Sequence, residues 1–141
     1  MSGEHWVRVG AILGALAVTV GAFGAHGLKP TAKELHAMSD EDREATVRRL
    51  ENFETGVRYH VYHALAIVGL GVFATRAPRG GRVLDAAGWL FVAGIALFPG
   101  SLYGIGVGGS KALGMVAPLG GLALIAGWIA FAIGAVDRGK I

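Results

Sequence analysis

The sequence predicts an all-α membrane protein: four transmembrane helices in a compact bundle, with an amphipathic lead-in helix before the second span. Hydrophobic residues make up 53% of the 141 residues and charged residues 16%, whereas a typical soluble domain has about 25% charged residues. Four apolar runs in the chain are each long enough to cross a bilayer core, which takes roughly 20 helical residues. Seven of the ten acidic residues fall between residues 34 and 54. We therefore expect residues 1–141 to form a single integral membrane domain with one solvated segment.

The first apolar run covers about residues 6–27, and its only charged side chain is Arg8, near the start. Backbone polar groups in hydrocarbon must be bonded within their own segment, so we expect this run to be a helix. A basic residue followed by an apolar stretch also occurs in secretory signal peptides. This run is longer than the apolar region of a typical signal peptide, and we interpret it as a span.

A charged amphipathic segment, about residues 31–55, precedes the second span, about residues 56–75. Ser39 is a candidate N-cap, because the acids of SDED that follow it suit the first turn of a helix. No proline occurs from there until Pro78, so we expect one helix from about Asp40 into the span. Its apolar positions recur at helical spacing: Val47, Leu50, Phe53 and Val57. We interpret the segment as a lead-in helix lying near the lipid head groups, with a partner-docking helix as the alternative.

The third and fourth spans cover about residues 84–106 and 112–136. The connections RAPRGGR and GVGGSK are short, which makes consecutive helices antiparallel neighbours. Small residues recur every three or four positions and predict close helix contacts. These residues are Gly10, Gly14, Ala17, Gly21 and Ala25 in the first span, Gly100, Gly104 and Gly108 in the third, and Ala126, Ala130 and Gly134 in the fourth. Packing within the chain and packing between chains, in a homo-oligomer, are both open.

Composition also bounds the partners and the location. The chain has no cysteine, a net charge of +3 and a pI of about 9.6. Its basic residues flank apolar runs, so membrane lipids explain them better than nucleic acid does. We expect the bacterial inner membrane. Lysines and arginines number six on one side and seven on the other, which does not fix the orientation; the short, dense RAPRGGR favours both termini inside.

Polar side chains of the spans gather towards one membrane face. The first and third spans end on that face, and the second and fourth begin there. Counting spans therefore predicts a polar cluster made of His26, Arg58, Tyr59, His63, Ser101 and Tyr103. In the other half of the bundle we expect few polar side chains apart from Thr19 and Thr75. Asymmetric polarity of this kind is a mark of a functional site in a membrane protein.

The cluster has three interpretations. His60 and His63 are three residues apart and share a helix face, so interhelical hydrogen bonding comes first. A polar pocket for a lipid head group, a quinone or a small solute comes second. Metal or haem ligation by His26, His60 and His63 comes third, because the spacing matches no specific metal motif and Glu54 is the nearest acid to the pair. Pro99 is expected to bend its helix and free a carbonyl that could bond Ser101.

Several motifs at these same positions resemble one family. They are GAFGAHGL at residues 21–28, FETGVRYHVYHALA at 53–66, FPGSLYG at 98–104, and APLGG at 117–121 followed by Gly127 and Trp128. Together they resemble the domain-of-unknown-function 423 family of small four-helix membrane proteins, relatives of the eukaryotic transmembrane protein 256. Members commonly have Gln at the place of His60 and a small residue at that of Pro99, which leaves His26 and His63 as the matched pair. The segment 29–50 is longer here than is typical.

The resemblance implies a fold and a membrane location, and no biochemical activity. The residues themselves offer no nucleophile, base and acid that could act together, so we expect a protein that is not an enzyme and needs no cofactor. The leading function is a polar cluster that binds a lipid head group or small ligand, or docks a partner. The alternatives are an oligomeric transporter or channel component for ions or small solutes, and an accessory subunit of a larger membrane complex.

Overall fold

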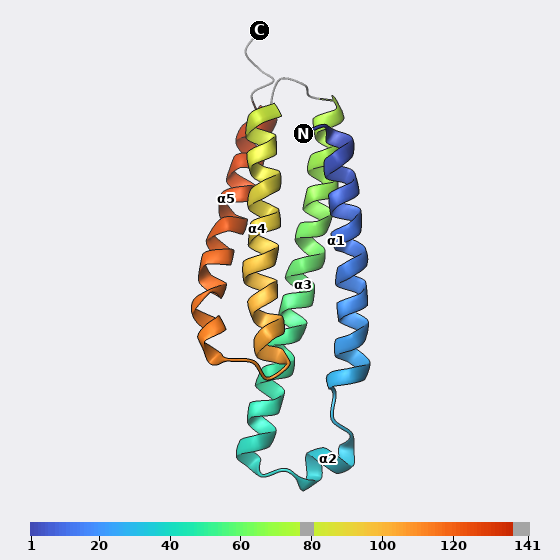
Figure 1. Ribbon diagram of the computed structural model, residues 1–141, viewed down its shortest axis with the longest axis vertical. Helices are drawn as coiled ribbons and strands as arrows, with labels where there is room; N and C mark the ends of the chain where they lie inside the picture. Colours follow the sequence, from blue (N-terminus) through green and yellow to red (C-terminus); the bar gives the residue numbers. More distant parts are fainter. Residues whose placement is uncertain (77–80, 137–141) are drawn as a thin grey trace.

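The computed structural model describes residues 1–76 and 81–136, and every regular element in those two stretches is a helix (Figure 1). Four stretches are long and apolar enough to cross a membrane: Gly3–Leu28, Asp40–Arg76, Gly81–Gly106 and Lys111–Val136. Each of them contains one of the predicted spans. Residues 77–80 and 137–141, which include Arg79, Arg138 and Lys140 of the charge count, lie outside the described part.

Helices α1 (Gly3–Phe23), α3 (Asp40–Arg76), α4 (Gly81–Gly106) and α5 (Ala117–Val136) form an antiparallel bundle. Figure 1 shows α1 beside α3, α3 beside α4, and α4 beside α5, the same order as along the chain. Two short turns extend this set: a π-helical turn, Gly24–Leu28, continues α1, and a 3₁₀ turn, Lys111–Met115, leads into α5. Short connections thus give neighbouring helices opposite directions, as the sequence predicts.

The core is apolar and the outer surface is apolar too. Trp6, Ile67, Leu70 and Phe91 are at most 1% exposed and fill the centre of the bundle. Large apolar side chains also point outward on every long helix, among them Leu16, Leu65, Trp89, Leu122 and Ile125. A water-soluble bundle does not distribute its side chains in this way, because exposed apolar patches of such extent are rare on soluble monomers. The structure therefore fits a protein whose solvent is lipid.

Small residues of α1 allow its backbone to approach α3 closely. The residues in this contact recur every seven positions, whereas the sequence pattern predicts a repeat of three or four. The buried small residues on this seam are Gly3, Gly10, Ala17 and Gly24. A Cβ added at Gly10 would lie 2.7 Å from the backbone nitrogen of Val68, whereas one at Gly14 would meet nothing within 4 Å. The GxxxG of Gly10 and Gly14 thus contributes one residue to the contact.

Helix α5 repeats the same spacing against α4. Gly120 packs on the backbone at Phe98, Gly127 on the Phe91 ring and Gly134 on Leu84. Of the predicted stripe, Gly134 is buried on this seam, Ala130 is half-buried and packs against the core, and Ala126 is half-buried. A repeat of seven corresponds to 3.5 residues per turn, which keeps one seam in contact along helices that wind around each other with a left-handed twist.

The predicted lead-in helix is the first part of α3 and is continuous with the span. Ser39 is its N-cap: the hydroxyl oxygen accepts the backbone N–H of Asp42 at 3.1 Å. At 1.5 Å per residue the 37 residues of α3 extend about 55 Å, well beyond a hydrocarbon core of about 30 Å. Figure 1 shows this part continuing the axis of the span past the ends of α1 and α4. The segment therefore continues the bundle axis beyond its neighbours, whereas the sequence interpretation places it near the lipid head groups.

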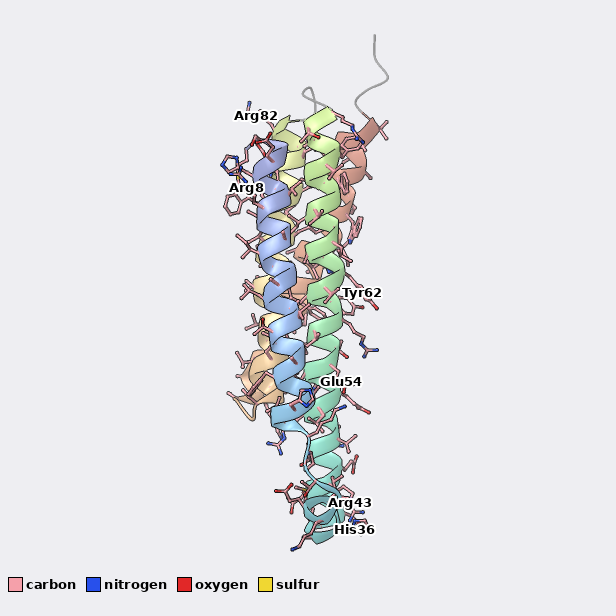
Figure 2. All side chains as sticks on the ribbon, turned by 90° about the vertical axis from the view of Figure 1, so that its right-hand side faces the viewer. Arg8, His36, Arg43, Glu54, Tyr62 and Arg82 are labelled. Atoms are coloured by element: carbon pink, nitrogen blue, oxygen red, sulfur yellow. The ribbon has the colours of Figure 1, made fainter. Side chains whose placement is uncertain are left out.

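A short helix, α2 (Ala32–Ala37), lies beside the start of the projecting part of α3 (Figure 1). Thr31 and Glu34 form a capping box at its start: the Glu34 carboxylate accepts the Thr31 N–H at 2.7 Å, and the Thr31 hydroxyl oxygen accepts the Glu34 N–H at 3.3 Å. Arg43 of α3 donates to the carbonyl oxygen of Leu35 at 3.1 Å. Figure 2 shows Arg43 and His36 together at this end, with Arg8 and Arg82 at the other.

We expect Gly10→Ala to destabilise the protein by roughly 1–3 kcal/mol, because the added methyl group meets α3 backbone atoms that cannot rotate away. Gly14→Ala, on the same helix in open space, should be neutral or slightly stabilising. Reversible unfolding in detergent micelles measures both. Equal losses for the two variants would contradict the seven-residue seam.

The capping box makes the order of α2 depend on pH. Hydrogen bonds from Thr31, its backbone N–H first and its hydroxyl second, lower the pKa of Glu34 below the ordinary value of 4.5. A lowered folded-state pKa stabilises the helix above the ordinary pKa, and this contribution is lost as the pH falls through the lowered value. Amide hydrogen exchange of α2 should therefore accelerate in acid beyond the change in intrinsic rate. Glu34→Gln should abolish that pH dependence; if it persists unchanged in the variant, Glu34 is not its source.

Candidate functional site

His63 is the buried polar residue that links helices α3 and α5. Its Nδ1 lies 2.7 Å from the carbonyl oxygen of Tyr59, one turn earlier on α3. Its Nε2 lies 3.2 Å from the indole nitrogen Nε1 of Trp128 on α5. A carbonyl oxygen can only accept and an indole N–H can only donate, so the proton of the neutral ring is on Nδ1 and the lone pair on Nε2. Both ring nitrogens are thereby satisfied, although the residue is only 6% exposed.

Aromatic rings surround the His63 imidazole. The ring of Tyr59 stacks on it with 6.0 Å between centroids, and the Phe91 ring lies at 5.7 Å. Trp128 approaches edge-on at 6.2 Å and also packs against Phe91. These contacts fix the plane of the imidazole, because each alternative side-chain rotamer would displace a packed ring. Interhelical hydrogen bonding, the first of the three interpretations, describes His63.

His26 does not reach His63, contrary to the expected matched pair. It is exposed on the π-helical turn Gly24–Leu28. The residues on either side of His26 show which part of α3 lies beside it. Gly24 packs on Phe53, and Lys29 pairs with Glu54 at 3.3 Å. His63 is nine residues further along α3 than Glu54, which corresponds to about 14 Å. The two histidines share a membrane face but differ in depth.

The three histidines do not form a metal site. Within residues 1–76 and 81–136, no group of three His, Cys, Asp or Glu side chains is placed to hold a metal ion. His63 has no free lone pair, because Trp128 occupies its Nε2. His60 faces a different neighbour: its Nδ1 lies 3.0 Å from the hydroxyl of Tyr103 on α4. In this arrangement His26, His60 and His63 are therefore not placed to share one metal ion.

The remaining predicted residues fall into separate places. Ser101 is buried on α4, and its hydroxyl donates to the carbonyl oxygen of Leu97 on the same helix. Tyr103 packs between His60 and the Phe53 ring, whose centroid is 5.1 Å from its own. The predicted cluster is thus divided: His63 bonds Trp128 of α5, the Tyr59 ring packs on His63 and on Phe98 of α4, Tyr103 bonds His60, and Ser101 bonds its own helix.

Arg58 lies at a groove between the end of α1 and α3. The groove encloses about 280 Å³ and is lined by Gly21, Gly24, Ala25, Phe53, Glu54, Val57 and Arg58. The glycines and Ala25 leave it open, since none carries a side chain beyond a methyl group. Glu54 is neutralised by Lys29 at 3.3 Å. The guanidinium of Arg58 donates to the Thr55 hydroxyl at 3.2 Å, and no ion pair within the described residues involves it.

A second cationic residue, Arg49, faces the opposite side of α3. It lines a smaller pocket of about 140 Å³ with Leu28, Thr46, Leu50, Gly106 and Val107. Its guanidinium donates to the Thr46 hydroxyl at 3.2 Å. Arg49 and Arg58 are nine residues apart, which places them on opposite helix faces. Basic side chains therefore flank α3 on two sides where it leaves the bundle.

Sequence reasoning missed a polar contact at the other end of the bundle. Asp85, in the first turns of α4, accepts the indole N–H of Trp6 at 2.8 Å, and the Met1 amine also contacts its carboxylate. Trp6 is 1% exposed. The expectation of few polar side chains in this half, apart from Thr19 and Thr75, is therefore wrong. The signal was available, because α1 and α4 both begin on this side and each carries a hydrogen-bonding side chain within two turns of its start.

Four apolar helices with apolar side chains on their outer faces define a multi-pass integral membrane protein. The chain belongs to the family described as "Protein of unknown function (DUF423)", whose pattern it matches over residues 20–121. It is 40% identical over 131 residues to the membrane protein YwdK of Bacillus subtilis, covering 93% of this chain and 95% of that protein. It is 32% identical over 139 residues to the inner membrane protein YgdD of Escherichia coli, covering 96% and 92%.

A membrane protein of Haemophilus influenzae is 32% identical over 131 residues and 93% of each chain. These names state a membrane location and no enzymatic activity. The expected location, the bacterial inner membrane, agrees with the name of the E. coli relative. No solved structure matches this one.

The hydrogen bond between His63 and Trp128 should appear as coupling in a double-mutant cycle. His63→Ala and Trp128→Phe together should cost less than the sum of the single changes, with a coupling of about 0.5–1.5 kcal/mol, in the range of interhelical bonds in lipid. His26→Ala combined with His63→Ala should be additive, because the two residues are far apart. The free energy of unfolding in micelles measures both cycles. Coupling between His26 and His63, without coupling between His63 and Trp128, would refute the assigned hydrogen bond.

Proposed function

We propose that this membrane protein is a lipid-binding protein without catalytic activity, and that the groove between α1 and α3 holds an anionic phospholipid. In this proposal the phosphate binds the Arg58 guanidinium and an acyl chain lies in the groove. The observation that carries it is a cationic side chain, without a carboxylate partner among the described residues, at the mouth of an apolar groove near the end of two spans.

The groove suits an acyl chain, because its lining is largely apolar and it opens at the side of the bundle. Its floor is formed by glycines, Ala25, Val57 and the Phe53 ring, which present no unmet hydrogen-bonding side chain. It is open at the side, where lipid surrounds the bundle. Burial of apolar surface there is worth about 25 cal/mol per Å² relative to water, but little relative to other lipid. The head group must therefore supply most of the selectivity.

Arg58 is suited to recognise that head group. A guanidinium presents planar N–H groups that match a phosphate in two simultaneous bonds. Glu54, one turn earlier, would repel an anion, but Lys29 neutralises it. Tyr62, one turn further along α3, is 57% exposed, and Figure 2 shows it pointing away from the bundle. Tyrosines at this position favour the boundary between hydrocarbon and head groups.

Binding is better supported than transport or catalysis. Trp6, Ile67, Leu70 and Phe91 fill the centre of the bundle, which argues against a polar path through one copy of the chain. A serine hydroxyl and a histidine imidazole can act together as nucleophile and base. Here the Ser101 hydroxyl bonds the Leu97 carbonyl oxygen, and His63 bonds Tyr59 and Trp128. Neither a transporter component nor a subunit of a larger complex has a comparable feature in its favour.

Retention of lipids by the purified protein tests this proposal. We expect native mass spectrometry to show preferential retention of phosphatidylglycerol over phosphatidylcholine, and Arg58→Gln to reduce that preference about tenfold, as expected for loss of one charge-assisted hydrogen bond. Arg48→Gln is the matched control, because Arg48 is paired with Glu44 on the projecting part of α3. Ala25→Phe should fill the groove and lower retention of both lipids. An unchanged preference in Arg58→Gln would reject the head-group assignment.

A further inference from the structure

His60 has a buried nitrogen that the protein does not satisfy. The residue is 6% exposed, and its Nε2 is a fully buried side-chain atom without a hydrogen-bond partner among residues 1–76 and 81–136. Within hydrocarbon such a group destabilises the fold unless something bonds it. Buried ionisable residues within spans are rare and mark sites. The lipid groove and the Arg49 pocket are not lined by His60, so this nitrogen belongs to neither of them.

The partner of Nδ1 determines what Nε2 offers. Nδ1 lies 3.0 Å from the Tyr103 hydroxyl, which can donate or accept. If the hydroxyl donates, Nδ1 is the acceptor, Nε2 carries the proton, and one group remains unmet. If Nδ1 donates, both the Nε2 lone pair and the tyrosine proton remain unmet. The first arrangement leaves fewer unsatisfied groups, so Nε2–H is a donor that requires an acceptor.

Pro99 provides an acceptor at the same depth. It lies inside α4 and has no N–H, so the carbonyl oxygen of Ile95 lacks its usual helical donor. Ser101 does not replace that donor, since its hydroxyl bonds Leu97. Pro99 is less than 2% exposed and Ile95 is 5% exposed, so this carbonyl lies on a buried face of α4.

The register of α3 against α4 brings the two groups to one level. Gly56 packs on Leu102 and Tyr103, and seven residues later His63 packs on Phe91. In an antiparallel pair, His60 lies between these contacts and therefore opposite the turn from Ile95 to Pro99. Ala64 and Ile67, one and two turns further along α3, are also buried.

We propose that a single water molecule is bound between His60 and the Ile95 carbonyl oxygen, accepting the Nε2–H of the imidazole and donating to the carbonyl. A buried water makes two to four hydrogen bonds to groups that would otherwise be unsatisfied, and these two groups meet the minimum. The water joins α3 to α4 at the turn where Pro99 interrupts the helix. This site is independent of the proposed lipid groove.

Two substitutions of His60 separate the two ring nitrogens. Asn carries its amide near the position of Nδ1, and Gln carries its amide near that of Nε2. We expect each variant to lower the folded-to-unfolded ratio about fivefold, because His60→Gln loses the bond to Tyr103 and His60→Asn loses the bond to the water. If Nε2 is simply unsatisfied, deleting it relieves a cost, so a His60→Asn variant at least as stable as the wild type overturns the proposal.

Nuclear magnetic resonance of the micelle-embedded protein, labelled with ¹⁵N-histidine, observes the water directly. We expect Nε2 of His60 to be protonated and its proton to show a through-space cross-peak to water. Pro99→Ala restores an N–H donor to the Ile95 carbonyl, and we expect the cross-peak to be lost. An unprotonated Nε2, a missing cross-peak in the wild type, or a cross-peak unaffected by Pro99→Ala overturns the assignment.

Discussion

Water is scarce inside a bilayer, so each polar group placed there needs a partner within the bundle. This constraint accounts for the positions of the buried polar side chains. His63 obtains one bond from its own helix and one from α5, Ser101 obtains its bond from its own helix, and Trp6 donates to Asp85. The polar groups therefore specify which helices are neighbours and how these helices are positioned relative to each other along the bundle axis. The apolar side chains tolerate several arrangements.

These bonds require helices that come close together, and the small residues make that possible. The seam of Gly3, Gly10, Ala17 and Gly24 holds α1 on α3, and Gly120, Gly127 and Gly134 hold α5 on α4. Glycine lowers helix propensity by about 1 kcal/mol relative to alanine in water. In lipid that loss is offset by packing and by interhelical hydrogen bonds at short range. The high glycine content therefore allows the close helix contacts that the few interhelical hydrogen bonds require.

Much of the fold could be predicted from the sequence, because span length, span number and short connections each have a direct physical consequence. The Ser39 cap and the continuous helix after it were predictable for the same reason. The pairing of His26 with His63 was not, since counting spans gives the membrane face of a residue but not its depth. Spacings of four and of seven both occur among the small residues of α1, and only the position of α3 decides which of them packs. Asp85 was overlooked because polar groups were sought at one face alone.

The continuity of α3 has a mechanical consequence for the segment outside the membrane. The part of α3 before the bundle is a straight extension of a packed helix, and Arg43 fastens α2 to its tip. For a rigid rod of about 55 Å that pivots at Arg76, its end in the bundle, a tilt of about 10° moves the opposite tip sideways by about 10 Å. The same tilt hardly shifts residues at the pivot within the bundle. The chain thus has the geometry of a lever, in which small changes in bilayer thickness or helix inclination become large displacements of α2 in the aqueous phase.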